Sequence, residues 1–379
     1  MGLNNPTQAG KPFFRLRANG KDITPDINDR LFSLQLTDGT GYESDLLEIV
    51  LVNDNESKLI KIPPKGAEIE LDLGYELYSR KMGMFVTDEI ELAGWPVAMV
   101  IRNRAAVFNT TKAGKQNMTE QKSRSWEKST TIAGMANKIA AEHDMKAVIS
   151  SEVGSIELPH TDQHEESDLN LLLRICQKYD VVVKVAGGVI ALSKRGSKKS
   201  ASGKDLPTVT IRREDCTAFR WRSSTKESAG TVIAFYRVTK KGARQEVQVG
   251  SGEPVRRVKN LYPSEKMATA AAKAMLAKAS RDELELNITT VGNPDYMAEM
   301  LVTVTGIYEG IDGDYIVKSV THKVDGESGY SCDLVLVLPN SDQEPEVKVV
   351  AHEAPKKGST DLDKDDYDGG VITLKPLKA

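Results

Sequence analysis

The residues of this sequence that could do chemistry gather in one short stretch. Residues 160–168 read His-Thr-Asp-Gln-His-Glu-Glu-Ser-Asp, two imidazoles among four carboxylates, and such a mixture can bind a metal or transfer protons. A structural interpretation is favoured, because Ser167 suits a helix N-cap and Asp168 suits the first helical turn. Adjacent Glu165 and Glu166 cannot face one site if the chain that leads to this helix is extended.

No second set of reactive groups supports a catalytic site. The sequence contains no HExxH, zinc-type Cys/His spacing, GxSxG, P-loop or GxGxxG. Cys176 falls on the apolar side of a helix, Cys332 in a strand and Cys216 in a turn, which is typical of packed or idle thiols. The sequence therefore predicts a protein that is not an enzyme and has no catalytic residue, cofactor or metal.

Composition narrows the class of protein further. The 379 residues carry 51 Lys and Arg against 54 Asp and Glu, a net charge of -3, and the mean hydropathy is -0.37. No apolar run approaches the ~20 residues of a membrane span, and Met1 to Pro6 lack the features of a signal peptide. We expect a folded protein without a membrane anchor, made in the cytoplasm.

Basic segments do not outweigh this charge balance. Lys194 to Lys204, Arg212-Arg213 and Arg220-Trp221-Arg222 could contact nucleic acid, but a solvated linker and a strand with one charged face explain them more simply. A dedicated nucleic-acid binder normally carries a clearly basic domain. We expect no specific nucleic-acid partner.

The elements that position the polar stretch begin with a β unit. Ile69-Glu70-Leu71-Asp72-Leu73 alternates apolar and acidic residues, as a strand with one wet face requires. Asn19-Gly20 predicts a tight turn after another such strand. The same pattern predicts about six strands, at Phe14–Ala18, Arg30–Leu36, Asp45–Val52, Ile69–Leu73, Met82–Leu92 and Val97–Ala105. Residues 1–107 are predicted to be a first β-barrel domain.

Residues 108–200 are predicted to be a small α+β insertion module. A polar stretch from Thr110 to Lys122 indicates an exposed loop. Helices are expected at Ile132–Ala140, behind Ser129-Thr130-Thr131, and from Ser167 to about Tyr179-Asp180. A hairpin at 181–193 turns at Gly187-Gly188, and Lys194–Asp205 indicates a flexible boundary.

Strands resume after that boundary. Residues 201–340 are predicted to be a second β-barrel domain with one Ala-rich helix, Ser264–Ser280, and residues 341–379 a flexible acidic tail that includes Asp361–Asp368. The fold class is mainly β (α+β), with two similar tube-type β-barrels, the insertion and the tail.

The two β units share a weak internal likeness. Residues 67–74 followed by 83–90 can be aligned with 298–306 followed by 313–320. From the residues alone, chance and duplication are equally good explanations. The strands proposed as equivalent are marked by Ile69, Leu71 and Leu73 in one unit and by Leu301, Thr303 and Thr305 in the other.

The polar stretch, taken together with the helix and hairpin that come after it, also resembles a known family. Residues 163–180 and the hairpin resemble the Q-x-x-E-S-D-x-x-x-L-x-R-L-A-x-x-Y-G segment of the phage late control gene D proteins. These are baseplate hub proteins of contractile tails, related to the Mu-type tail hub and to the N-terminal part of VgrG. The matching residues are Gln163, Glu166, Ser167, Asp168, Leu172, Arg174 and Tyr179. Cys176 and Asp180 stand where the family often has Ala and Gly.

The resemblance implies a structural role in a phage, prophage or pyocin-like particle that is made in the cytoplasm of a bacterial host. It implies a homotrimer around a channel, whose six quasi-equivalent barrels adapt a threefold central spike to a sixfold tail tube. Its partners would be further copies of itself, the spike, the tube, other baseplate proteins and the tape-measure protein, in the virion tail baseplate. It also gives duplication a physical purpose, because barrel edges would pair around the ring.

Two alternatives remain open at this point. A cell-wall or glycan-active tail protein could use Glu165 and Asp168 as acid and base, which requires carboxyl groups ~5 to 9.5 Å apart across a cleft. A type VI, VgrG-like secretion hub is the other, although we expect such a chain to continue into a spike β-helix.

Overall fold

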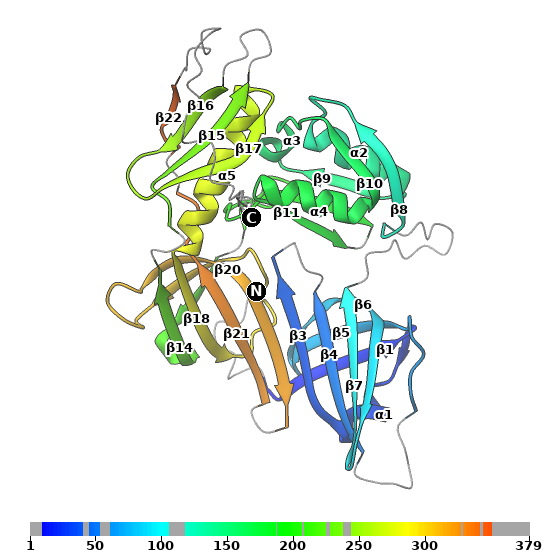
Figure 1. The fold of residues 1–379 in the computed structure, drawn as a ribbon. Coiled ribbons are helices and arrows are strands. Elements are labelled where there is room, and N and C mark those ends of the chain that lie inside the picture. Colours follow the sequence, from blue (N-terminus) through cyan, green and yellow to red (C-terminus); the bar gives the residue numbers. More distant parts are fainter. Residues whose placement is uncertain are drawn as a thin grey trace, which may run out of the picture.

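The computed structural model describes residues 10–40, 45–53, 61–105, 118–186, 188–206, 208–224, 228–237, 244–326, 329–341 and 344–350. These residues form two halves, each with its own apolar core (Figure 1). The lower half in that view contains two β units, and the upper half contains most of the helices and the three smaller sheets. The predicted acidic segment Asp361–Asp368 lies outside the described residues, as does the turn residue Gly187.

The first β unit confirms the strands expected from alternation. Its strands pair in the order β1-β5-β6-β7-β4-β3, and the short β2 extends β1 through a turn in which Asn19 and Gly20 both have positive φ. Apolar residues of alternating strand positions, such as Leu71 and Leu47, are buried inside it. The elements are β1 (Pro12–Ala18), β2 (Lys21–Asp22), α1 (Thr24–Ile27), β3 (Leu31–Gly39), β4 (Leu46–Asn53), β5 (Glu68–Tyr75), β6 (Tyr78–Ala93) and β7 (Val97–Ala105).

The second β unit repeats this order with its own strands. They pair as β13-β19-β20-β21-β18-β14. One step differs, since β13 runs parallel to β19 whereas β1 runs antiparallel to β5. The strands are β13 (Thr208–Arg212), β14 (Cys216–Ser223), β18 (Leu284–Val291), β19 (Leu301–Thr305), β20 (Gly313–Asp325) and β21 (Gly329–Val337).

Two irregularities of each unit fall at the same places, whereas the shift between Leu71 and Asp72 in the pairing of β5 with β6 has no counterpart in the pairing of β19 with β20. In β6 the register shifts between Thr87 and Glu89, and in β20 between Val317 and Ser319. In β3 it shifts between Leu31 and Ser33, and in β14 between Cys216 and Ala218. A bulge inserts one residue at a defined position, so shared bulges favour duplication over chance.

The marker residues for the likeness face different ways. Ile69, Leu71 and Leu73 of β5 are buried in the core, whereas the buried residues of β19 are Val302 and Val304. Leu301, Thr303 and Thr305 lie on the opposite face of β19, because successive side chains of a strand alternate. The strand pairing shows which inward-facing residues are equivalent. Ile69 lies opposite Phe85 in β6, and Val302 lies opposite Tyr315 in β20, so Val302 is the counterpart of Ile69.

The two units are joined edge to edge within the chain. The second half of β20 pairs antiparallel with β3, from Ser319 opposite Gly39 to Asp325 opposite Ser33. This pairing makes one continuous sheet of 13 strands through both units. Their buried apolar residues accordingly form a single core.

The upper half contains the α+β module. Its helices begin as predicted: Thr131 accepts a hydrogen bond from the Gly134 N–H at 3.0 Å, and Ser167 accepts one from the Asn170 N–H at 3.2 Å. Both are N-caps. The elements are β8 (Gln121–Trp126), α2 (Ile132–Glu142), β9 (Lys146–Ile149), α3 (Ser151–Gly154), β10 (Thr161–Ser167), α4 (Asp168–Lys178), β11 (Val181–Ala186) and β12 (Val189–Lys194).

The rest of the upper half differs from the expected grouping. A four-stranded sheet, β17-β15-β16-β22, and the Ala-rich helix share the core of the α+β module, although they were expected with the second β unit. The pattern of a strand shows that one face is buried but not against what. The elements are β15 (Thr231–Arg237), β16 (Arg244–Gly250), β17 (Val255–Tyr262), α5 (Glu265–Asp282) and β22 (Val347–Val350).

Three expected loop segments also contain ordered structure. The last two residues of the predicted polar loop, Gln121 and Lys122, begin strand β8, with Gln121 opposite Ser167 of β10. Residues 347–350, expected in the flexible tail, form β22 against β16. In the predicted flexible boundary, the Arg195 side chain donates to the Thr40 carbonyl at 3.0 Å. Polar composition did not reveal these backbone partners.

Candidate functional site

Two residues of the family-like motif, Gln163 and Asp168, meet three side chains from outside the motif around one buried carboxylate. Asp168 begins α4 and its side chain is 0% exposed. Arg124 Nη2 lies 2.6 Å from Oδ1, Lys122 Nζ 2.7 Å from Oδ2 and His143 Nε2 2.8 Å from Oδ2. Gln163 Nε2 donates to Oδ1 at 2.8 Å. We call these five residues the Asp168 cluster.

Electrostatics keep this carboxylate ionised. Burial alone would raise the pKa of Asp168, but hydrogen bonds from Lys122, Gln163 and His143 together with the nearby Arg124 charge outweigh burial and lower the pKa to about 2. At neutral pH the Asp168 carboxylate is therefore charged, and both of its oxygens have hydrogen-bond partners.

The cluster connects strands β8 and β10 to helices α2 and α4. Arg124 also binds Glu142 of α2 through both carboxylate oxygens, at 2.6 and 2.8 Å, and its guanidinium lies over the Trp126 ring at 4.5 Å. Gln163 Oε1 accepts from Arg124 Nε at 2.8 Å and from Trp126 Nε1 at 3.3 Å. The three guanidinium nitrogens of Arg124 thus donate to three different side chains in one plane, which fixes orientation as well as distance.

The remaining motif residues fasten α4 itself. Arg174 donates to both carboxylate oxygens of Glu166, at 2.8 and 2.7 Å, and to the Asp162 carbonyl at 3.1 Å. Leu172 and Tyr179 are buried in the upper core. The structure thus brings together Gln163, Glu166, Ser167, Asp168 and Arg174 at the entry of the helix, where each has a structural partner.

The residues considered for catalysis do not make an open site. Asp168 is enclosed, and Glu165 lies at the β-bulge of β10 with a positive φ of 46°. Within the described ranges, no three His, Cys, Asp or Glu side chains are grouped to hold a metal. Cys176, Cys216 and Cys332 are buried, and burial raises the pKa of the Cys176 thiol to about 12.

A second polar cluster joins the two halves. Asp180, which follows the C-cap of α4, has a φ of 56°, a conformation that favours glycine and tolerates Asp. Its carboxylate forms a buried ion pair with Arg281 near the end of α5. Arg281 also donates to Asn340, and Asn340 donates to the Arg195 carbonyl at 2.6 Å. Asp180, which stands where the family often has Gly, therefore has a structural role, because its carboxylate pairs with Arg281.

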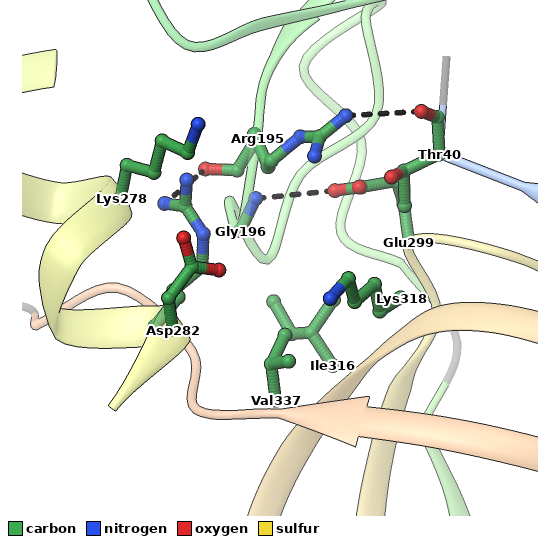
Figure 2. A pocket seen from close by; sticks show the side chains of 10 residues that line it. Thr40, Arg195, Gly196, Lys278, Asp282, Glu299, Ile316, Lys318 and Val337 are labelled. Atoms are coloured by element: carbon green, nitrogen blue, oxygen red, sulfur yellow. Dashed lines mark hydrogen bonds between the residues drawn. The ribbon is translucent and has the colours of Figure 1, made fainter. Parts of the chain in front are cut away.

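Figure 2 shows the pocket beside this cluster, where both halves meet. Gly196 N–H donates to Glu299 Oε2 at 3.1 Å, and Arg195 reaches across to Thr40 at the end of β3. Burial raises the pKa of Glu299, opposed by nearby Arg195. Nearby, Lys184 of β11 binds Asp38 of β3 at 2.6 Å. These contacts connect the α+β module to both β units.

Sequence reasoning missed the cations of both clusters. Lys122 is the last residue of the stretch predicted to be an exposed loop, Arg124 lies just beyond it where no element was predicted, and Arg281 lies at the end of the Ala-rich helix. The alternation Lys122, Arg124, Trp126 is a strand signal that could have been found, since these three side chains share one face. Nothing local marks Arg281, whose partner is 101 positions away.

Comparisons with known proteins agree on one family. A family model described as phage tail baseplate hub (GPD) matches residues 116–328. The chain is 30% identical to the probable baseplate hub protein of Escherichia phage 186, over 88% of this chain and 94% of that protein. It is 29% identical to the probable baseplate hub protein of Escherichia phage P2, over 89% and 96%.

Solved structures share the fold. The 43 kDa tail protein of prophage MuSo2 from Shewanella oneidensis matches with a TM-score of 0.62 at 14% identity, over 86% of this chain and 98% of that one. An Escherichia coli component of the type VI secretion system matches with a TM-score of 0.52 at 11% identity, over 87% and 78%. Among the described residues, no helix has the length and apolar character needed to span a membrane.

Proposed function

Because this chain belongs to the phage tail baseplate hub family, we propose that it works as a homotrimeric symmetry adaptor between a threefold central spike and a sixfold tail tube. It is a structural hub protein of the phage tail, and its place is the tail baseplate. The oligomeric state and the individual partners belong to the proposal.

One observation carries the proposal: a single chain holds two β units with the same strand order, joined edge to edge through β3 and β20. If the two units are quasi-equivalent barrels, three chains present six of them in a ring. Such a ring has threefold symmetry by subunit and near-sixfold symmetry by barrel. The domain division into residues 1–107, 108–200, 201–340 and 341–379 is part of this proposal, with β15–β17 and α5 as an insertion in the second unit.

We further propose that the protein acts through surfaces and not through catalysis. One candidate, Asp168, is enclosed by four side chains, and the other, Glu165, lies at the bulge of β10 and not across a cleft from it. A peptidoglycan-hydrolysis assay tests this. Hydrolysis by the pure protein that disappears in Glu165→Gln would contradict a solely structural role.

The central test is the mass of the assembly by light scattering, with imaging of rings, for the chain alone and mixed with spike and tube proteins. We expect a mass of three chains and a ring in the mixtures, because partner binding favours the closed state by mass action. Persistent monomers in the presence of both partners would overturn the proposal.

A further inference from the structure

Among the strand edges that have no partner strand within the described part of the chain, the second β unit has one on β14 and the first has one on the second half of β6. β14 pairs only with β18. β6 pairs with β5 as far as Val86, and from Asp88 to Ala93 it pairs only with β7. Unpaired edges present N–H and C=O groups that can bind another strand.

The equivalent edges of the same molecule are paired with each other. β20 corresponds to β6 in strand order, and β3 corresponds to β14. The first half of β20 pairs with β19 as β6 pairs with β5, but its second half pairs with β3. The contact between the two units within one chain is therefore made by the counterparts of the two open edges.

Shared bulges turn this correspondence into a residue register. Leu92 of β6 and His322 of β20 stand the same number of residues after the bulge in their strands, so the two positions correspond. Counting in the same way, Trp221 of β14 corresponds to Leu36 of β3. His322 lies opposite Leu36 in the pairing within the chain.

Exposure distinguishes the paired edges from the open ones. Leu36 is 2% and His322 0% exposed, whereas Trp221 is 43% and Leu92 54% exposed. Trp221 and Leu92 are large apolar residues that are exposed at positions whose counterparts are buried. This difference indicates that a partner strand is missing at each open edge.

We propose that β14 of one subunit pairs antiparallel with residues 89–93 of β6 in the next copy of this chain, in the register that β3 and β20 use. This places Trp221 against Leu92 and Arg222 against Glu91 of the neighbour. The proposal rests on the homotrimer proposed above and names its subunit interface. The contact is head to tail, so each subunit uses each edge once, and in the proposed homotrimer the third contact closes the ring.

Charge supports the same pairing. β14 carries Arg220 and Arg222, while the open part of β6 carries Glu89 and Glu91. Arg102 is the shared partner of Glu48, Glu89 and Glu91, at 3.0 to 3.2 Å, so three carboxylates face one guanidinium and a further cation is favourable. At the equivalent pair within the chain, Thr37 Oγ1 and Thr321 Oγ1 lie 3.3 Å apart, which shows that side chains at this position meet.

Disulfide trapping tests the register. In the double variant Leu92→Cys and Trp221→Cys, assembled with spike protein and oxidised, we expect covalent dimers and trimers and no larger species. The matched control, Leu92→Cys with Arg222→Cys, shifts one residue and puts the second thiol on the other face of β14. The natural cysteines are buried and give little background.

Charge reversal tests the pairing without cysteines. We expect Arg222→Glu to weaken trimer formation at least about tenfold, Glu91→Arg to do the same, and the double variant to recover most of the loss. Arg257→Glu, on β17 in the other half, is the matched control and should leave the trimer unchanged.

The outcomes separate this inference from the function that it rests on. Trimers that form without cross-linking at 92 and 221, and that are indifferent to Arg222→Glu and Glu91→Arg, overturn the proposed interface and leave the hub proposal standing. Wild-type chains that remain monomeric with spike and tube overturn both.

Discussion

The two β units differ in their connections and edges more than in their central strands. Between β3 and β4 the first unit has only residues 40–45, whereas between β14 and β18 the second unit has residues 224–283, with three strands and a helix. The bulges and the strand order nevertheless agree. The comparison teaches that this strand order tolerates a large insertion at one loop, provided that the insertion buries its apolar face elsewhere.

The largest expected effect contrasts two equivalent positions, Leu36 and Trp221. Leu36→Asp places a carboxylate in the closed contact of the two units, and we expect the free energy of unfolding to fall by at least about 4 kcal/mol. Trp221→Asp, at the open edge, should lower it by about 1 kcal/mol or less. Urea denaturation of the isolated subunit measures both. Equal losses would mean that the two edges are alike in the monomer.

The insertion itself is tested at the ion pair that fastens it. Arg281→Met leaves Asp180 buried without its charge partner, and we expect a loss of about 3–5 kcal/mol. Adding Asp180→Gly removes the stranded carboxylate and suits the positive φ of that position, so the double variant should recover much of the loss. Hydrogen exchange should show faster opening of β15–β17 in the single variant, and protection equal to wild type would contradict this role.

The next effect concerns the pH dependence of stability. His322 is buried, donates or accepts at Tyr330 Oη (2.8 Å) and the Tyr296 carbonyl (3.2 Å), and faces Cys332 and the Asp38 charge. Burial lowers its pKa from 6.5 to about 4, so the unfolded chain binds the proton more tightly. Its contribution is complete above pH 6.5 and is lost as the pH falls to about 4, roughly 3 kcal/mol.

His322→Leu makes this position resemble Leu92 of the first unit. We expect lower stability at pH 7, because the Tyr330 hydroxyl loses a partner, but a smaller decline between pH 6.5 and 4. Thermal unfolding across that range measures the slope. A slope unchanged from wild type would show that other groups cause the acid sensitivity.

The smallest effect concerns the hydroxyl pair of the closed contact. Thr37→Val or Thr321→Val should cost about 1 kcal/mol, and a double-mutant cycle should give a coupling of about 0.5 kcal/mol or more. The matched first-unit change, Glu91→Gln, should leave the stability of the monomer nearly unchanged, because that carboxylate lies at an open edge. Absence of coupling between Thr37 and Thr321 would contradict a direct contact.

Sequence patterns predicted the local elements well and their grouping less well. Alternation placed β5 and β7, and the hydroxyls of Thr131 and Ser167 placed both helix starts, because these signals lie within a few residues of their effects. The membership of β15 and α5 in the upper half could not be predicted, since a pattern shows that a face is buried without naming the partner. Asp168 was correctly interpreted as a helix-start residue, but its cations come from a strand 44 to 46 positions earlier.

The seam between β3 and β20 has a mechanical consequence. Its register runs over seven consecutive residue pairs, from Ser319 opposite Gly39 to Asp325 opposite Ser33. Ladder hydrogen bonds of an antiparallel pair lie across the strands, so a pull along the strands loads the whole row together, whereas a pull that separates one end loads the bonds one after another. The seam is therefore stiff against sliding of one unit past the other and weaker against unzipping from an end.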